Sequence, residues 1–150
     1  MSWRRTAASR KSKSSDVGAV TADGNVKIKS SNTAKVVTTN DSGGDLVLKG
    51  SSTVDGNITL DGRVIKIKGS RVEGNVRASG VEKIKDSMVE GPIEAEGDVE
   101  TIKNSTVEGT IDAGGDVLLK GNTTVEGDVI ATGTVRTSSG VTVTGTVKQT

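Results

Sequence analysis

Charged residues recur at regular intervals along this chain of 150 residues, and they are the first candidates for chemistry. In one column each acidic residue directly follows a valine, and in a second column lysines recur at a similar interval. The acidic column comprises Asp55, Glu73, Glu90, Glu108 and Glu126, and the lysine column comprises Lys49, Lys68, Lys85, Lys103 and Lys120. Like charges about 4.8 Å apart repel by roughly 0.9 kcal/mol in water and by less in salt, so each column has an energetic cost.

Three interpretations of these columns remain open. They form a solvated face that keeps neighbouring rods apart, they pair with columns of opposite charge on a second filament, or the acids bind cations. Gly-Gly-Asp segments at Gly43 and Gly114 resemble part of a calcium-binding nonapeptide, but the full nine-residue motif does not occur. We therefore predict no metal site and no cofactor.

The chain contains no histidine and no cysteine, which restricts its enzymatic chemistry. Without them, the usual pairs of nucleophile and base, and sites for soft metals, are not available. Two carboxylates could serve a glycosidase, but a regular ladder of acids on a convex edge differs from a pair in a cleft. We predict that the protein is not an enzyme and has no catalytic residues.

The first residues form a basic segment that lacks the periodicity of the rest. Its bases are Arg4, Arg5, Arg10, Lys11 and Lys13, and no acid occurs before Asp16. Such a serine-rich segment cannot bury enough apolar surface to fold alone, so we predict a disordered tail over residues 1–16. Its role is either to keep the protein soluble or to tether it to an anionic membrane, where Trp3 would favour the interface. Contact with nucleic acid is the weakest interpretation, because one aromatic residue gives no array for base stacking.

The element that must position the charged columns is a repeat of about 18 residues. Val-Glu-Gly occurs at Val72, Val89, Val107 and Val125, with Val54-Asp55-Gly56 before it and Val143-Thr144-Gly145 after it. The repeat divides into six-residue words in which the first and fifth residues are small or aliphatic and the third is usually glycine. Neighbouring side chains of a strand point to opposite faces, so the first and fifth residues share a face, and glycine suits a bend between two strands. Three such sides per repeat predict a triangular β-solenoid, since an α-solenoid would need a longer repeat.

Four aliphatic columns are predicted to fill a narrow core, which fits the absence of phenylalanine and tyrosine. They are Val54, Val72, Val89, Val107, Val125 and Val143; Ile58, Val76, Ile93, Ile111, Val129 and Val147; Leu60, Ala78, Ala95, Ala113 and Ala131; and Leu46, Val64, Val81, Val99, Val117 and Val135. A small polar column is expected to form hydrogen bonds along the stack, and it comprises Ser52, Ser70, Ser87, Ser105 and Thr123. We predict an all-β fold, a single-stranded triangular β-solenoid of about seven coils over residues 17–150.

Rungs such as Val-Glu-Gly-Asn-Val and Val-Glu-Gly-Pro-Ile, with Ala-x-Gly-x-Val on the second side, resemble those of the bactofilins over roughly residues 17–150. The resemblance implies a right-handed β-helix that polymerises end to end without nucleotide into cytoskeletal filaments. It also implies a cytoplasmic protein, located at the inner face of the membrane if the basic tail is a tether. Bactofilins commonly carry a phenylalanine near the C-terminal end for polymerisation. This chain has none, so its end contacts must be aliphatic.

The ends of a β-solenoid independently favour assembly, because a terminal coil presents unpaired backbone groups and an aliphatic core. Soluble repeat proteins normally add a polar cap, and no cap is visible in this sequence. We predict a homopolymer with interface residues Val20, Val26, Ile28, Val141, Val143 and Val147. The predicted partners are other copies of the chain, an anionic membrane surface, and recruited proteins that the sequence does not identify. The alternative is an extracellular or viral β-solenoid, such as a fibre, a spike or a surface filament.

Overall fold

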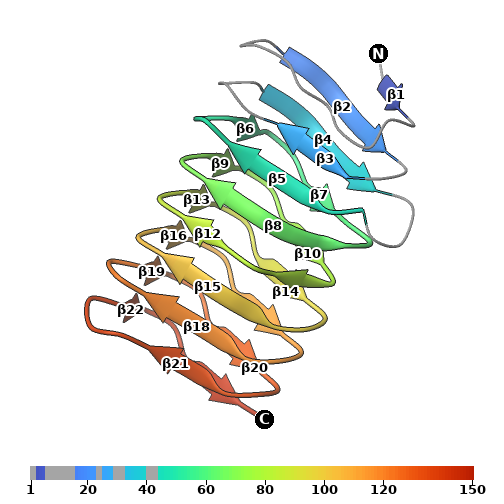
Figure 1. Cartoon of the computed structure of the whole chain (residues 1–150). Coiled ribbons are helices and arrows are strands. Elements are labelled where there is room, and N and C mark those ends of the chain that lie inside the picture. Colours follow the sequence, from blue (N-terminus) through green and yellow to red (C-terminus); the bar gives the residue numbers. More distant parts are fainter. Residues whose placement is uncertain (1–2, 6–15, 23–24, 29–32, 40–43) are drawn as a thin grey trace.

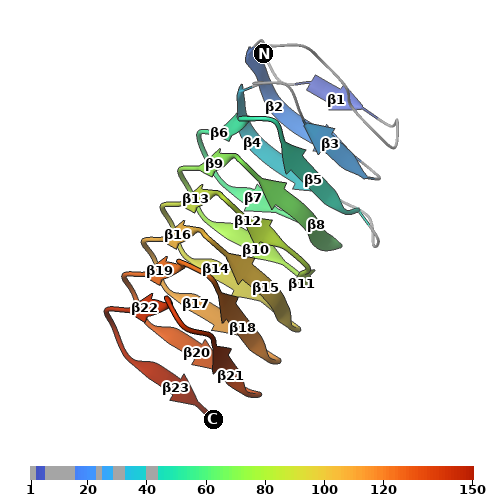
Figure 2. The same cartoon turned by 60° about the vertical axis from the view of Figure 1, so that its left-hand side comes forward.

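A computed structural model describes residues 3–5, 16–22, 25–28, 33–39 and 44–150. These residues form strands, turns and bends, without a helix, and their strands stack as successive coils of a rod (Figures 1 and 2). Residues 44–150 make six turns, and strands of successive turns pair in parallel about 18 residues apart. An irregular coil precedes them. The predicted all-β solenoid is therefore confirmed.

Each turn contributes to three faces of the rod. The first face consists of β6 (Thr53–Val54), β9 (Arg71–Val72), β13 (Met88–Val89), β16 (Thr106–Val107), β19 (Thr124–Val125) and β22 (Thr142–Val143). The second consists of β7 (Ile58–Thr59), β10 (Val76–Ala78), β14 (Ile93–Ala95), β17 (Ile111–Ala113), β20 (Val129–Ala131) and β23 (Val147–Gln149). The third consists of β3 (Val26–Ile28), β5 (Leu46–Lys49), β8 (Arg63–Lys68), β11 (Gly80–Val81), β12 (Ile84–Lys85), β15 (Val99–Lys103), β18 (Val117–Lys120) and β21 (Val135–Thr137).

The four predicted aliphatic columns point into the rod. All their members are buried except those of the last coil, where Val135 and Val143 are partly buried and Val147 is 44% exposed. Valine, isoleucine and alanine fill this narrow interior because side chains from three faces meet there. The prediction of these columns is confirmed.

A fifth aliphatic column was not predicted, although its members are 0% exposed: Leu48, Ile67, Ile84, Ile102 and Leu119. These residues lie on the third face, where the strands are longest. The register shifts between Leu46 and Val47 when β5 pairs with β8, and between Val99 and Ile102 when β15 pairs with β18. Each member directly precedes a lysine of the lysine column, which recurs at the same unequal intervals. The sequence therefore contained a signal for this column, and a fixed count of six residues per side misses it.

The N-terminal strands are less regular than the six turns. They are β1 (Trp3–Arg5), β2 (Asp16–Ala22) and β4 (Thr33–Thr39). β4 bridges the first two faces, because its start pairs with β6 and its later part pairs with β7. β2 pairs with β4 on one side and with β1 on the other.

Within the segment predicted as a disordered tail, residues 1–16, the strand Trp3–Arg5 pairs in parallel with Val20–Ala22. The pairing gives the backbone groups of β1 partners that a free tail would find only in water, and it covers one edge of β2. The predicted boundary between tail and solenoid at residue 17 is not otherwise tested.

Candidate functional site

The last coil is the candidate assembly surface at the C-terminal end. Its strands β21, β22 and β23 each stand at the end of a path of paired strands. Val141 and Val143 are partly buried and pack against the core, whereas Val147 is the exposed large hydrophobic residue among those whose burial the structure describes. In the preceding coils the equivalents of Val147, namely Val129 and Ile111, are 0% exposed. The end of the rod thus leaves one aliphatic column partly uncovered.

In the inner coils, backbone N–H groups of the second face donate to carbonyl groups of the next coil. The N–H of Ile111 donates to the carbonyl of Asp128 at 2.8 Å, and the N–H of Val129 donates to that of Thr146 at 2.9 Å. By the same register, the N–H of Val147 points towards the end of the stack, where no further strand follows it among the described residues. Such an edge offers a template for one more parallel strand.

Gln149 satisfies one donor at this edge from within the last coil. In the coil before, the N–H of Val117 donates to the carbonyl of Thr134 at 2.9 Å. The equivalent N–H of Val135 instead donates to Oε1 of Gln149 at 3.0 Å. A coil that adds to this end must therefore displace the amide of Gln149 on the third face. Beside the first face, the N–H of Val141 donates to the carbonyl of Ser138 at 3.4 Å, which is also a contact within the last coil.

The three residues predicted for the N-terminal interface lie in the core. Val20, Val26 and Ile28 are 4%, 2% and 2% exposed, respectively. Val20 is flanked in register by Trp3 on one side and Val37 on the other. The structure therefore does not leave these side chains as an open aliphatic surface, because they pack within the N-terminal coils. Among the described residues, β3 stands at the end of its sheet.

The residues predicted as a membrane tether are only partly described. Trp3, Arg4 and Arg5 form β1 at the N-terminal end of the rod (Figure 1). Arg10, Lys11 and Lys13 lie outside the described residues.

The acidic column is held in line by the backbone. The N–H groups of Glu73, Glu90, Glu108 and Glu126 donate at 2.8–2.9 Å to the carbonyl of the valine one coil earlier. These side chains are exposed, except that Glu90 is half-buried. Nε of Arg71 donates to Glu90 at 2.7 Å, and the guanidinium also forms an ion pair with it. This hydrogen bond and the charge of Glu90 raise the pKa of Arg71 above its usual value.

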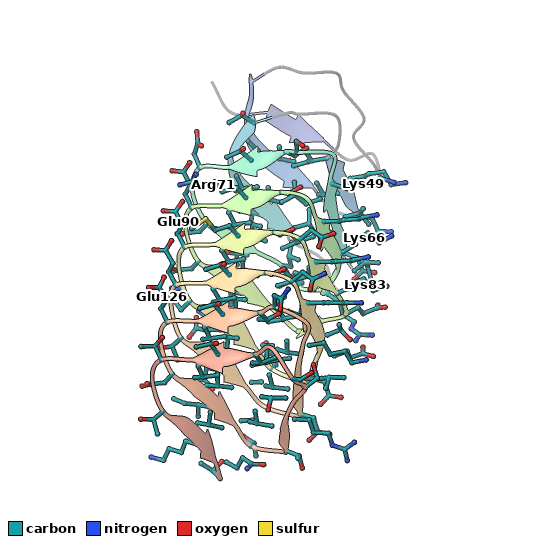
Figure 3. The ribbon with its side chains drawn as sticks, turned by 90° about the vertical axis from the view of Figure 1, so that its left-hand side faces the viewer. Lys49, Lys66, Arg71, Lys83, Glu90 and Glu126 are labelled. Atoms are coloured by element: carbon teal, nitrogen blue, oxygen red, sulfur yellow. The ribbon has the colours of Figure 1, made fainter. Side chains whose placement is uncertain are left out.

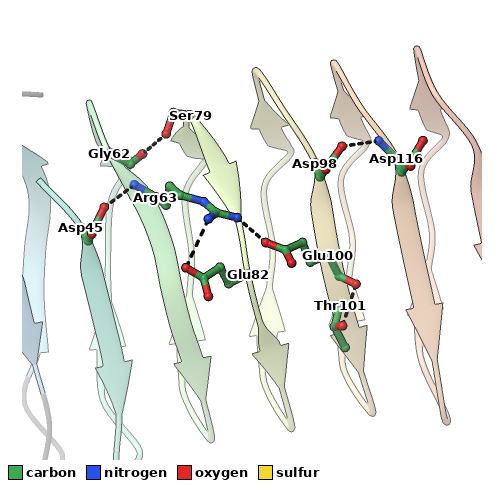
Figure 4. A network of polar contacts seen from close by, with 9 residues as sticks. All are labelled: Asp45, Gly62, Arg63, Ser79, Glu82, Asp98, Glu100, Thr101 and Asp116. Atoms are coloured by element: carbon green, nitrogen blue, oxygen red, sulfur yellow. Dashed lines mark hydrogen bonds and ion pairs between the residues drawn. The ribbon is translucent and has the colours of Figure 1, made fainter. Parts of the chain in front are cut away.

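The lysine column is a ladder in direct register. Each of its members has the next one as its Cα partner on the neighbouring strand, from Lys49 through Lys68, Lys85 and Lys103 to Lys120. No ion pair to any of them occurs among the described residues, although Arg63 pairs with Glu82 at 3.4 Å and with Glu100 (Figure 4). The predicted column is confirmed, and its charges face solvent without a counter-charge in that part of the chain.

The small polar column fixes the corner beside these lysines. The hydroxyls of Ser87 and Ser105 donate to the carbonyls of Lys85 and Lys103 at 2.7 and 2.8 Å. The N–H of Ser70 donates to Oγ of Ser87 at 3.2 Å, and the N–H of Ser87 donates to Oγ of Ser105 at 3.1 Å. These buried side chains satisfy backbone groups in two coils at once, as predicted. They thereby hold the lysine-bearing strands at one spacing.

In the described part of the chain, neither a metal centre nor a membrane-spanning helix accompanies these surfaces. Within the described ranges, no group of three or more acidic side chains is placed to hold a metal ion. The same residues include no helix that is long and apolar enough to cross a membrane. No family model, no curated protein and no solved structure matches this chain. The function must therefore be argued from the geometry of the rod.

Proposed function

We propose that this protein is a structural, non-enzymatic protein whose copies stack end to end into filaments without nucleotide. The proposal gives it the role of the bactofilins that its repeat resembles, as a cytoplasmic scaffold. One observation carries it. The aliphatic column that is fully buried at Ile93, Ile111 and Val129 continues to Val147, which is 44% exposed at an unpaired strand edge.

A second copy would complete this edge with the interactions that hold the rod together internally. Three strands would gain parallel partners, and Val141, Val143 and Val147 would be covered. Complete burial of one aliphatic side chain stabilises by about 1.5–3 kcal/mol, whereas association costs about 4–15 kcal/mol in lost freedom of motion. Burial of one side chain is thus insufficient, and a stable contact requires all three faces of the coil to pair with the second copy.

The purified protein should form thin, unbranched filaments in negative-stain electron microscopy, and their formation should not depend on ATP or GTP. Val147→Asp would place a charge on the surface that assembly buries, at a cost of several kcal/mol. We expect short oligomers with unchanged circular dichroism, because only the last coil is altered.

Thr142→Asp is the matched control for this experiment. Thr142 lies in the same coil, is exposed, and pairs in register with Thr124 on the outer side of the first face. The same charge there should leave filaments intact. A wild-type protein that remains a monodisperse monomer at tens of micromolar across salt conditions would refute the proposal, as would Val147→Asp filaments of normal length.

The proposal includes a tether to anionic membranes through residues 1–15. Its support is the run of five bases without an acid. Each base near an anionic leaflet contributes about 1 kcal/mol, and a filament would present many such segments to one surface. Wild-type filaments should therefore sediment with vesicles containing phosphatidylserine at low salt and not with neutral vesicles.

A variant with glutamine at all five bases is the sharper test of the tether, because it retains the backbone of β1. The substituted positions are Arg4, Arg5, Arg10, Lys11 and Lys13. This variant should form normal filaments that no longer sediment with the anionic vesicles. If the wild type also ignores these vesicles at low salt, the segment is a solubilising tail and not a tether.

A further inference from the structure

The two charged columns lie on opposite sides of the rod. In Figure 3, Glu90 and Glu126 project from one edge, while Lys49, Lys66 and Lys83 project from the other. Lys66 and Lys83 extend the lysine side, because each directly precedes a buried isoleucine, and these isoleucines, Ile67 and Ile84, are register partners. The first face separates the two edges, so one copy cannot bring its own lysine column against its own acidic column.

Both columns advance by one charge per coil. The acidic column follows the backbone hydrogen bonds from each acid to the valine of the preceding coil. The lysine column follows direct Cα register between neighbouring strands. Because one stack of strands sets both spacings, a lysine column that lies along the acidic column of another copy meets one acid per lysine over its whole length. The charges of an unrelated polyanion would have a different spacing and would not match the lysines one to one.

Both columns also lack enough partners within the chain. Among the described residues, the ion pairs involve only Arg63 and Arg71, and Glu90 is the single member of either column that takes part. The charge of Arg71 also acts on Glu73 and Glu108, so the acidic column is partly compensated. The lysine column has no ion pair among the described residues. Charge complementarity favours contact between these columns when two rods lie side by side.

We propose that the acidic column of a second copy is the partner of the lysine column, so that rods associate laterally. In such a contact one copy keeps a free acidic edge and the other keeps a free lysine edge. The interface is heterologous, and it leads to open ribbons instead of closed pairs. Exposed ion pairs are individually weak, so a detectable lateral contact rests on the proposed filaments, which repeat it many times.

Salt should separate lateral association from end-to-end assembly. The screening length falls from about 30 Å at 0.01 M to about 3 Å at 1 M salt. In negative-stain micrographs we expect ribbons at about 0.01 M and single filaments at about 1 M, because the end contact is aliphatic and survives screening. Ribbons that persist at the higher salt would overturn the proposal, whereas a failure of end-to-end assembly would appear separately as short particles.

Two charge-reversal variants test which surfaces meet. The first carries Lys68→Glu, Lys85→Glu and Lys103→Glu, and the second carries Glu73→Lys, Glu108→Lys and Glu126→Lys, which spares the Arg71–Glu90 pair. Either variant alone should form single filaments at low salt, since three of the five contacts between the two columns then bring like charges together. Preformed filaments of the two variants, when mixed, should form ribbons again.

The mixture distinguishes a second copy from a different polyanion. If the lysine column binds only an unrelated polyanion, the wild type forms no ribbons in the absence of that polyanion, and the mixed variants remain as single filaments. Either result would overturn the proposal. Ribbons formed by either variant alone would overturn it as well. Circular dichroism of both variants checks that these exposed substitutions leave the strands intact.

Discussion

Ile111→Asp should abolish the cooperative folding of the solenoid. Ile111 is 0% exposed and stands in register between Ile93 and Val129, in the middle of an aliphatic column. Burial of an isolated carboxylate costs far more than the roughly 2–7 kcal/mol of an unpaired neutral polar group. The total stability of a domain is only about 5–15 kcal/mol, so the substitution removes most or all of it. Far-UV circular dichroism and urea denaturation would show this as a lost or strongly shifted transition.

Position in the stack provides the control for this prediction. Val147→Asp places the same group in the same column, two coils further on, where the native side chain is 44% exposed. It should leave the transition of the isolated protein nearly unchanged. The conservative variant Ile111→Val should lower the free energy of unfolding by only about 0.5–1.5 kcal/mol. An Ile111→Asp protein that unfolds cooperatively with wild-type stability would show that the central coils do not form the core of the rod.

Gly109→Ala should destabilise the protein although it adds only one methyl group. A Cβ at Gly109 would lie 2.5 Å from the carbonyl carbon of Gly91 and 2.5 Å from the nitrogen of Pro92. Both atoms are backbone, and the neighbouring hydrogen bond from Glu108 to Val89, at 2.9 Å, holds the coils together. Overpacking of this kind costs about 1–3 kcal/mol or more. For a chain of this size each kcal/mol corresponds to about 2–4 °C, so thermal unfolding followed by circular dichroism should detect the loss.

Gly69→Asn is the matched control for the crowded corner. Gly69 has a φ of +60°, and a Cβ at this position would meet no atom within 4 Å beyond its chain neighbours, so its environment is open. The equivalent corners already hold Asp86 and Asn104, each with a φ of 51°. Asparagine tolerates this conformation, and the melting temperature should change little. Equal losses for both variants would show that the close approach of backbones at Gly109 is not what makes glycine necessary.

Most of the fold could be predicted from the sequence because each repeat of the sequence corresponds to one turn of the solenoid. A residue such as Val107 recurs at the interval of one turn, so its burial follows from its place in the period. Ile102 is equally buried and directly precedes Lys103, so its column recurs as the lysine column does, but a fixed count of six residues per side misses it. β1 was missed for a different reason. Its pairing with β2 depends on a tertiary contact that the composition of a basic segment does not indicate.

The candidate assembly surface could be predicted only in part. Periodicity indicates that Val147 and Val26 each face inward, but it does not indicate whether another coil covers them. The structure covers Val26 and leaves Val147 partly exposed. The contact of Gln149 with Val135 has no periodic signal at all, because it occurs once, at the last coil. The charged columns were predictable because they recur, whereas their placement on opposite edges required the three-dimensional path of the turns.

The hydrogen bonds that join each coil only to the next also govern how the rod loses structure. In a chain built this way, stability is approximately a sum of terms for each coil and for each interface between neighbours. Among the described residues, the last coil has a neighbour on one side only, so in isolation it should fray more readily than β14 or β17, which are paired on both sides. Added copies would convert this frayed end into an interior coil. A filament would therefore protect its members from local opening, and the vulnerable coils would be confined to its two tips.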